Sequence, residues 1–277
     1  MNYHEKAREL YSFIEGSKRL VVITGAGCST NSGISDYRDN NGFWKIAPPI
    51  EHQDFLRSVK ARKRYWFRSQ LGFPFFRDAK PNRAHLVLAM LEKKGLVEAV
   101  ITQNVDRLHQ KAGHQRVIDL HGRLDQVRCL DCGQIWPRTE IQDWLELKND
   151  LTEIQNFELR PDGDASIVDP DFGLFQEPEC SKCTGILQPD VVFFGGSVSK
   201  EISRETRLLI DSCDGVLVIG TSLMAFSSFR LIRRAHQRSL PIAGLNLGVT
   251  RADDLLNKKI IGDSARVLGA LQRNFFS

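Results

Sequence analysis

The sequence contains no apolar run long enough to cross a bilayer, no internal repeat and no low-complexity tract. A membrane-spanning helix needs about 20 consecutive apolar residues. The first residues, Met1 to Lys6, show neither the apolar core of a secretory signal nor an Arg/Ser-rich transit pattern. We therefore expect a cytoplasmic protein of bacterial type that has no membrane partner.

The sequence also has few cysteines and a small net charge. Six cysteines in 277 residues do not suggest a disulfide framework. A net charge of +4 is too small to indicate specific nucleic-acid binding. With 42% hydrophobic and 26% charged residues, the composition is that of a globular protein. The length fits one large domain, alone or with a small insert.

A glycine-rich turn directly follows the first predicted strand. The run Arg19–Ile23 is short, apolar and β-branched, and glycines at positions 25, 27 and 33 follow among small hydroxyl residues. Glycine lets the backbone approach a ligand, and exposed N–H groups there can hold phosphate. The pattern predicts the first nucleotide-binding crossover of a doubly wound α/β sheet. Since the spacing departs from G-x-G-x-x-G, a plain tight turn is the alternative, but the polar Asp36-Tyr37-Arg38 favours a ligand.

Polar residues also follow two further predicted strands, over 96–102 and 116–120. Gln103-Asn104-Val105-Asp106 follows the first, and His121 follows the second. Ligands of open α/β sheets bind at the carboxyl ends of the strands. A histidine there suits general-base chemistry, although a lone histidine is often only a surface or core residue. Asn104 and Asp106 could equally cap a helix.

The remaining elements predict one parallel-sheet domain that is interrupted by a helical module and a cysteine-bearing insert. Helices are expected over 3–16, 54–59, 62–71 and 82–94, with breaks at Pro74 and Pro81. Further along, strands are expected over 190–194, 215–219, 241–245 and 265–269, and helices over 200–211 and 227–238.

Two C-x-x-C pairs have metal-ligand spacing. They are Cys129-x-x-Cys132 and Cys180-x-x-Cys183. Two such pairs can complete a closed tetrahedral zinc site, and the segment between them must then loop out. A redox C-x-x-C is the alternative, but the glycines that follow the pairs favour structural zinc. Cys28 and Cys213 are expected to be buried and not to bind metal.

In this order, these motifs resemble the sirtuins, a family of NAD-dependent protein-lysine deacylases. The resemblance covers residues 15–270 and rests on 25–29, 32–38, 102–106, 121–122, the paired cysteines, 189–195, 220–222 and 245–246. Within the family, segments 64–66, 160–164 and 246–254 are most similar to the class II branch, which contains the human mitochondrial sirtuin four. The departures are Ser35 for the usual proline, Tyr37 for phenylalanine, and Gly196 for Glu or Asp.

The resemblance implies a Rossmann-type NAD-binding domain over 1–45, 96–128 and 186–277. It also implies a small lobe made of the helical module 46–95 and the zinc-binding insert 129–185. The implied NAD-binding residues are Gly25, Ala26, Gly27, Ser29, Thr30, Asp36, Tyr37, Arg38, Gln103, Asn104, Asp106, Gly220, Thr221, Ser222, Asn246, Leu247, Gly248 and Ser264. His121 would be the catalytic base, with Asn104 beside the nicotinamide. Val192 and Phe194 would hold the acyl-lysine.

The implied reaction consumes NAD and yields nicotinamide, free lysine and 2′-O-acyl-ADP-ribose. Protein mono-ADP-ribosyl transfer is the nearest alternative, and a hydride-transferring dehydrogenase is a second. A nucleic-acid-binding zinc ribbon is a third, but acidic residues outnumber basic ones over 129–185. We expect acylated proteins or peptides as partners of a monomer.

Tyr65 and Arg68 bear on the preferred acyl group. Residues three apart share one face of a helix. This pair resembles the one with which the desuccinylating branch of the family grips an acidic acyl end. Several basic residues surround it, so Arg68 could also be an ordinary surface charge.

Overall fold

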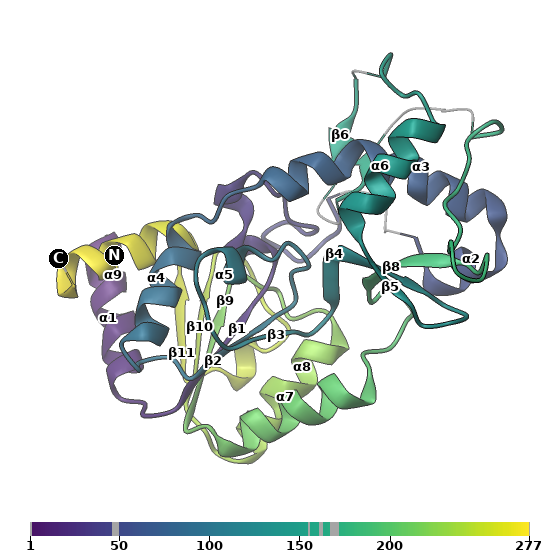
Figure 1. Ribbon diagram of the computed structural model, residues 1–277. Coiled ribbons are helices and arrows are strands. Elements are labelled where there is room, and N and C mark those ends of the chain that lie inside the picture. The colour runs from purple at the N-terminus through teal and green to yellow at the C-terminus, as the bar shows by residue number, and fades with distance from the viewer. Residues whose placement is uncertain (1, 46–49, 155, 161–162, 167–171, 277) are drawn as a thin grey trace.

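The computed structural model of the protein describes residues 2–45, 50–154, 156–160, 163–166 and 172–276 (Figure 1). Six parallel strands form the main sheet, in the order β11-β10-β9-β1-β2-β3. Their bounds are β1 Leu20–Thr24, β2 Ala99–Thr102, β3 Val117–Asp119, β9 Gly215–Ile219, β10 Ile242–Asn246 and β11 Lys258–Ile261. The strand order runs outward in both directions from β1 and β9, as in Rossmann-type sheets. The predicted fold class is therefore confirmed.

Helices cover both faces of this sheet because its strands are apolar on both sides; every residue of β1 and β9 is buried. On one face lie α1 (Tyr3–Glu15), α4 (Arg83–Lys93) and α9 (Ser264–Phe275), which share a core with Val22 and Val100. On the other face lie α7 (Lys200–Ser212) and α8 (Phe226–Gln237), which pack on Val21 and Ile101. The short elements α5 (Leu108–Lys111), η1 (Ala26–Cys28), η2 (Thr30–Ser32) and η3 (Asp253–Leu255) lie in connections.

A second, smaller sheet lies at the other end of the molecule (Figure 1). It is antiparallel, in the order β5-β4-β8, and packs with three helices on a separate aromatic core around Trp66. The bounds are β4 Gly122–Cys129, β5 Ile135–Pro137, β8 Leu187–Val191, α2 His52–Arg57, α3 Val59–Asp78 and α6 Arg138–Lys148. The strands β6 (Glu158–Leu159) and β7 (Ala165–Ser166) pair with each other as an antiparallel two-stranded ribbon.

Two predicted strands differ from the structure. The strand expected over 190–194 lies at 187–191, as β8, and pairs antiparallel with β4 outside the parallel sheet. The strand expected over 265–269 is helical, because Asp263 caps α9 by accepting the N–H of Arg266. The last strand is β11 instead.

Pro74 does not break its helix but lies inside α3. A proline removes the N–H that would reach the carbonyl four residues earlier, here that of Gln70. Gln142 of α6 supplies the missing donor, since its Nε2 lies 2.9 Å from that carbonyl oxygen. Contact with α6 thus compensates for the lost helical bond. No helix among the described residues is long and apolar enough to cross a membrane.

Candidate active site and metal centre

A cavity of about 710 Å³ lies along the carboxyl ends of the parallel strands and extends toward β8. It is lined by nearly all of the residues predicted to bind NAD: Ala26, Gly27, Ser29, Thr30, Asp36, Tyr37, Arg38, Gln103, Asn104, Asp106, Gly220, Thr221, Ser222, Asn246, Leu247, Gly248 and Ser264. His121, Tyr65, Val192 and Phe194 line it as well. Of the residues predicted to bind NAD or the acyl-lysine, only Gly25 and Arg68 are not in its lining.

Gly25 lies where the loops after β1 and β9 meet. A Cβ atom on Gly25 would lie 2.6 Å from the Cβ of Thr221, which is far inside van der Waals contact. Beside it, the Gly27 N–H donates to the carbonyl oxygen of Gly220 at 2.8 Å. Glycine therefore allows two strand ends to approach and to form a backbone-lined cradle. Such a cradle fits the phosphates of a dinucleotide.

Asn104 is held in place by the glycine loop. Its Nδ2 donates to the Gly25 carbonyl oxygen at 3.1 Å and to Ser29 Oγ at 3.0 Å. Ser29 in turn donates to Asp106 Oδ2 at 2.6 Å, and burial raises the pKa of Asp106. The other Asp106 oxygen accepts the N–H of Leu108 at the start of α5. Asp106 therefore both caps α5 and takes part in the hydrogen-bond network of the site.

Gln103 connects the strands on either side of β1. Its Nε2 donates to Thr221 Oγ1 at 2.9 Å, and its Oε1 accepts from Ser228 Oγ at 3.0 Å. The loop after β2, the loop after β9 and the start of α8 are thereby fixed relative to one another.

His121 faces this network from the end of β3. Its Nδ1 lies 3.2 Å from the backbone oxygen of Gln103, and its Nε2 lies 2.7 Å from Ser227 Oγ. A carbonyl oxygen can only accept, so the hydrogen-bond network assigns the proton to Nδ1 and leaves a lone pair on Nε2. Burial lowers the pKa of His121 to about 4, which keeps the ring neutral near pH 7. Sequence reasoning missed Ser227, because nothing distinguishes it from the adjacent Ser228.

The loop over 36–45 folds beside Phe194. The Arg38 guanidinium lies 4.0 Å from the centre of the Trp44 ring and donates to the Gly42 carbonyl oxygen at 2.7 Å. Trp44 contacts Phe194 edge-on, with ring centres 5.4 Å apart. Asp36 pairs with Lys45. Trp44 also lines the cavity; only its place in the turn 40–44 could have marked it.

The far end of the cavity lies at β10 and α9. Asn246 Nδ2 donates to the Gly248 carbonyl oxygen at 3.1 Å, and Ser264 Oγ donates to that of Gly27 at 3.2 Å. On the opposite side, the Val192 N–H donates to the His121 carbonyl oxygen at 2.8 Å. His121 therefore lies between the nucleotide-sized end and the Val192–Phe194 end.

Tyr65 and Arg68 have different environments. Tyr65 is buried against Phe55 and Phe193, with ring centres 5.5 and 5.3 Å away. Arg68 Nη2 lies 3.3 Å from Asp164 Oδ2, and its Nε donates to the carbonyl oxygen of Ala165. The structure does not bring Arg68 to the cavity together with Tyr65.

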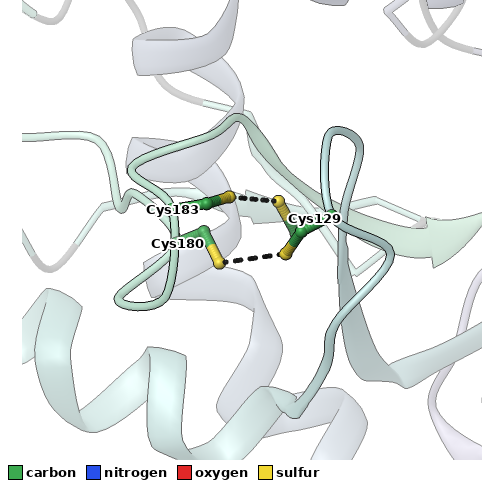
Figure 2. A group of neighbouring side chains, drawn as sticks. Cys129, Cys180 and Cys183 are labelled. Atoms are coloured by element: carbon green, nitrogen blue, oxygen red, sulfur yellow. Dashed lines mark hydrogen bonds between the residues drawn. The ribbon is translucent and has the colours of Figure 1, made fainter.

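The two C-x-x-C pairs meet at the end of the small sheet. Figure 2 labels three of the four cysteines, Cys129, Cys180 and Cys183. All four sulfur atoms lie within 4.8 Å of one another. The Sγ atoms of Cys129 and Cys183 are 3.5 Å apart, and those of Cys132 and Cys180 are 3.8 Å apart. Zn–S bonds of about 2.3 Å in a tetrahedron place sulfurs about 3.8 Å apart. The cluster thus fits a structural zinc ion, which would be held by four thiolates with no open position for catalysis.

A second cluster of potential ligands, Cys28, His85 and His109, lies in the core between β1 and α4. His85 Nδ1 accepts the Asn82 N–H at 3.2 Å, and His109 Nε2 is 2.9 Å from Thr24 Oγ1. With Nδ1 accepting, a neutral His85 carries its proton on Nε2 and has no lone pair to offer there. We read this cluster as a hydrogen-bonded part of the core.

Comparison with known proteins gives one consistent result. The Sir2 family profile matches residues 25–227. "NAD-dependent protein deacetylase 2" of Bradyrhizobium diazoefficiens is 49% identical over 253 residues, which are 91% of this chain and 93% of that protein. "NAD-dependent protein lipoamidase sirtuin-4, mitochondrial" of Bos taurus is 44% identical, over 92% and 82% respectively.

Solved structures agree. A Sir2 complex with a p53 peptide and NAD+ superposes with a TM-score of 0.77 and 28% identity, covering 96% of this chain and 97% of that one. The glycine cradle, the histidine at the cavity and the four-cysteine cluster are thus found in a chain whose sequence and fold match the same family. The chain belongs to the Sir2 family, the sirtuins.

Proposed function

We propose that this chain removes acyl groups from lysine side chains of proteins and consumes NAD in doing so. The observation that carries the proposal is the position of His121, whose unprotonated Nε2 lies at a cavity of about 710 Å³ and accepts a hydrogen bond from Ser227 there. One end of that cavity has the glycine cradle, and the other end has Val192 and Phe194. Relatives named NAD-dependent protein deacetylases match over nearly the whole chain.

NAD supplies an ADP-ribosyl group that releases nicotinamide and receives the acyl group. Gly25, Ala26 and Gly27, with Thr221 and Ser222, would hold its phosphates. Asn246 to Gly248 and Ser264 would hold the adenosine, and Gln103, Asn104 and Asp106 would face the nicotinamide side. Thr30, Asp36, Tyr37, Arg38 and Gly220 complete the proposed site. The acyl-lysine would enter beside Val192 and Phe194.

At its Nε2, in place of the Ser227 hydroxyl, His121 would take the proton of a ribose hydroxyl, and that oxygen would then attack the acyl carbon. Its neutral state fits this role, because a protonated ring has no lone pair. The Gln103 carbonyl oxygen keeps Nδ1 protonated and the ring oriented. Because nicotinamide would leave C1′ and the lysine amine would leave the acyl carbon, one water balances the reaction, and the products would be nicotinamide, free lysine and 2′-O-acyl-ADP-ribose.

Several finer points belong to the same proposal. The Rossmann-type domain would comprise 1–45, 96–128 and 186–277, and 46–95 with 129–185 would form the small lobe. The protein would act as a cytoplasmic monomer without specific binding to nucleic acid. Cys129, Cys132, Cys180 and Cys183 would hold one zinc ion per chain.

The direct test incubates the protein with NAD and acetyl- and longer acyl-lysine peptides and follows peptide mass and nicotinamide together. Equimolar loss of the acyl group and release of nicotinamide is the expected result. NADH absorbance without deacylation would instead indicate a dehydrogenase. Nicotinamide release with a mass gain on the protein would indicate ADP-ribosyl transfer.

A further inference from the structure

Outside the catalytic cavity, α7 and α8 lie side by side (Figure 1). Their side chains line a second hollow of about 450 Å³. We call it the α7–α8 groove. Six of its ten lining residues are cationic: Lys200, Arg204, Arg207, Arg230, Arg233 and Arg234. Spacings of three and four residues along each helix place these side chains on one face.

Most of these positive charges are available to a ligand. Lys200, Arg204, Arg207 and Arg233 are exposed, and among the described residues none of them lies within 4.0 Å of a carboxylate oxygen. Asp211, at the end of the groove, pairs with Arg234 and Arg238. Glu201 and Glu205 lie about a quarter turn or more away from the groove-facing side of α7. The groove therefore carries a net positive charge, because six cationic side chains and, within the described part of the chain, no acidic ones line it.

The groove is continuous with the catalytic cavity. Val198 and Arg230 line both. Arg230 Nη2 donates to Ser203 Oγ at 2.8 Å, which ties α8 to α7 at this shared wall. A chain that leaves the cavity past Val198 would enter the groove directly.

We propose that the α7–α8 groove binds acidic side chains of the protein substrate on one side of the acyl-lysine. This inference rests on the proposed deacylase function and adds a sequence preference to it. Arginine binds carboxylates through paired N–H donors, so several arginines along a groove select for Asp and Glu. The 13 residues of α7 span about 20 Å. An extended peptide covers that length with about six residues.

The shape and chemistry favour a peptide over nucleic acid. A duplex is much wider than a groove between two adjacent helices and would contact Glu201 and Glu205 beside it. Single strands bind where bases stack on aromatic rings. Among the described residues that line the groove, none is aromatic.

The experiment uses three acyl-lysine peptides: one with three glutamates placed two to six residues before the acyl-lysine, one with them after it, and one with glutamine in their place. Arg204, Arg207 and Arg233 are changed together to glutamine. The matched control changes Arg8, Lys93 and Lys94 to glutamine, which removes the same charge from exposed positions on α1 and at the end of α4, on the opposite face of the main sheet from α7 and α8. Salt is varied, because exposed ion pairs weaken with ionic strength.

We expect wild type and control to favour one acidic peptide over the glutamine peptide by about tenfold in kcat/KM, mostly through KM. The groove variant should lose that preference, and high salt should erase it in the other two proteins. Equal use of all peptides by wild type, or an unchanged preference in the groove variant, would overturn the proposal. So would charge-dependent binding of a labelled DNA duplex without any peptide preference.

Turnover of the glutamine peptide separates this inference from the deacylase function itself. If wild type turns over no peptide, the deacylase function fails, and fluorescence anisotropy of the labelled acidic peptides still tests the groove. Binding that weakens in the groove variant and not in the control would support it, and equal binding by all three proteins would refute it.

Discussion

The Nε2 atom of His121 lies 2.7 Å from the hydroxyl oxygen of Ser227, a residue contributed by the first turn of α8. Because Nδ1 is protonated by its bond to Gln103, Ser227 must donate to Nε2. The serine thus occupies the lone pair that the proposed base uses, and a ribose hydroxyl would take its place when NAD binds. Removing the imidazole and removing the serine should therefore have different consequences.

We expect His121→Ala to lower kcat/KM for deacylation by about 10²–10⁴-fold, the usual contribution of a general base. NAD affinity, measured by calorimetry, should stay close to wild type. Ser227→Ala should cost less than His121→Ala, because the ring keeps its Gln103 bond. His236→Ala, on an exposed residue near the end of α8, is the control and should be neutral. Near-normal turnover by His121→Ala would rule out this mechanism.

Stability should fall in mild acid. Burial lowers the pKa of His85 and of His121 from 6.5 to about 4, and that of His109 also falls well below its usual range. Below pH 6.5 the unfolded chain therefore binds protons that the folded chain does not, and folding loses free energy as pH decreases toward 4. At pH 5 this costs about 2 kcal/mol for a histidine with such a shift.

Urea unfolding at pH 7 and pH 5 measures this effect. The free energy of unfolding should be several kcal/mol lower at pH 5. Zinc content must be checked at both values, since thiolate ligands also take up protons in acid. Equal stability at pH 7 and pH 5, with zinc retained, would contradict the prediction.

The four-cysteine cluster should hold one zinc ion per chain, as measured by elemental analysis. Cys180→Ser should lose the metal and lower the melting temperature before it affects chemistry, because zinc binding in a closed site contributes to folding. Cys213→Ser is the control: Cys213 is also buried but lies beside α7, away from the cluster, and should keep the zinc. A metal-free protein lacking all four cysteines that was stable and active would refute the assignment.

How far the sequence predicts this structure depends on whether local signals decide the outcome. Residues 20–24 and 215–219 are buried on both faces, so their apolar runs predicted the parallel strands correctly. The segment 265–269 was predicted as a strand, because five residues are too few to reveal the 3.6-residue period that extends over 265–275. The helical bond lost at Pro74 is replaced by Gln142, whose hydrogen bond to the Gln70 carbonyl oxygen joins residues 72 apart and follows from no local rule. The pairing of Ser227 with His121 is equally non-local.

Arg68 illustrates the same limit at the level of function. Its spacing from Tyr65 predicted a grip on an acidic acyl end, whereas the structure pairs it with Asp164 at 3.3 Å. The Arg68 guanidinium is thus already paired with the Asp164 carboxylate, and Arg68 is not in the cavity lining. We therefore expect a positioning role, in which Arg68 ties α3 to the β6–β7 ribbon.

Arg68→Met should then lower the free energy of unfolding by roughly 1–3 kcal/mol, the usual cost of removing a charged hydrogen-bond partner from a buried carboxylate. The order of preference between acetyl- and succinyl-lysine peptides should not change. Arg68→Met combined with Asp164→Asn should cost less than the sum of the two single changes. The reason is that Asp164→Asn removes the negative charge whose cationic partner is lost in Arg68→Met. Arg64→Met, one turn away on the exposed side of α3, is the control and should be near neutral. If Arg68→Met kept wild-type stability and lost turnover of succinyl-lysine but not of acetyl-lysine peptides, Arg68 would instead contact the acyl group.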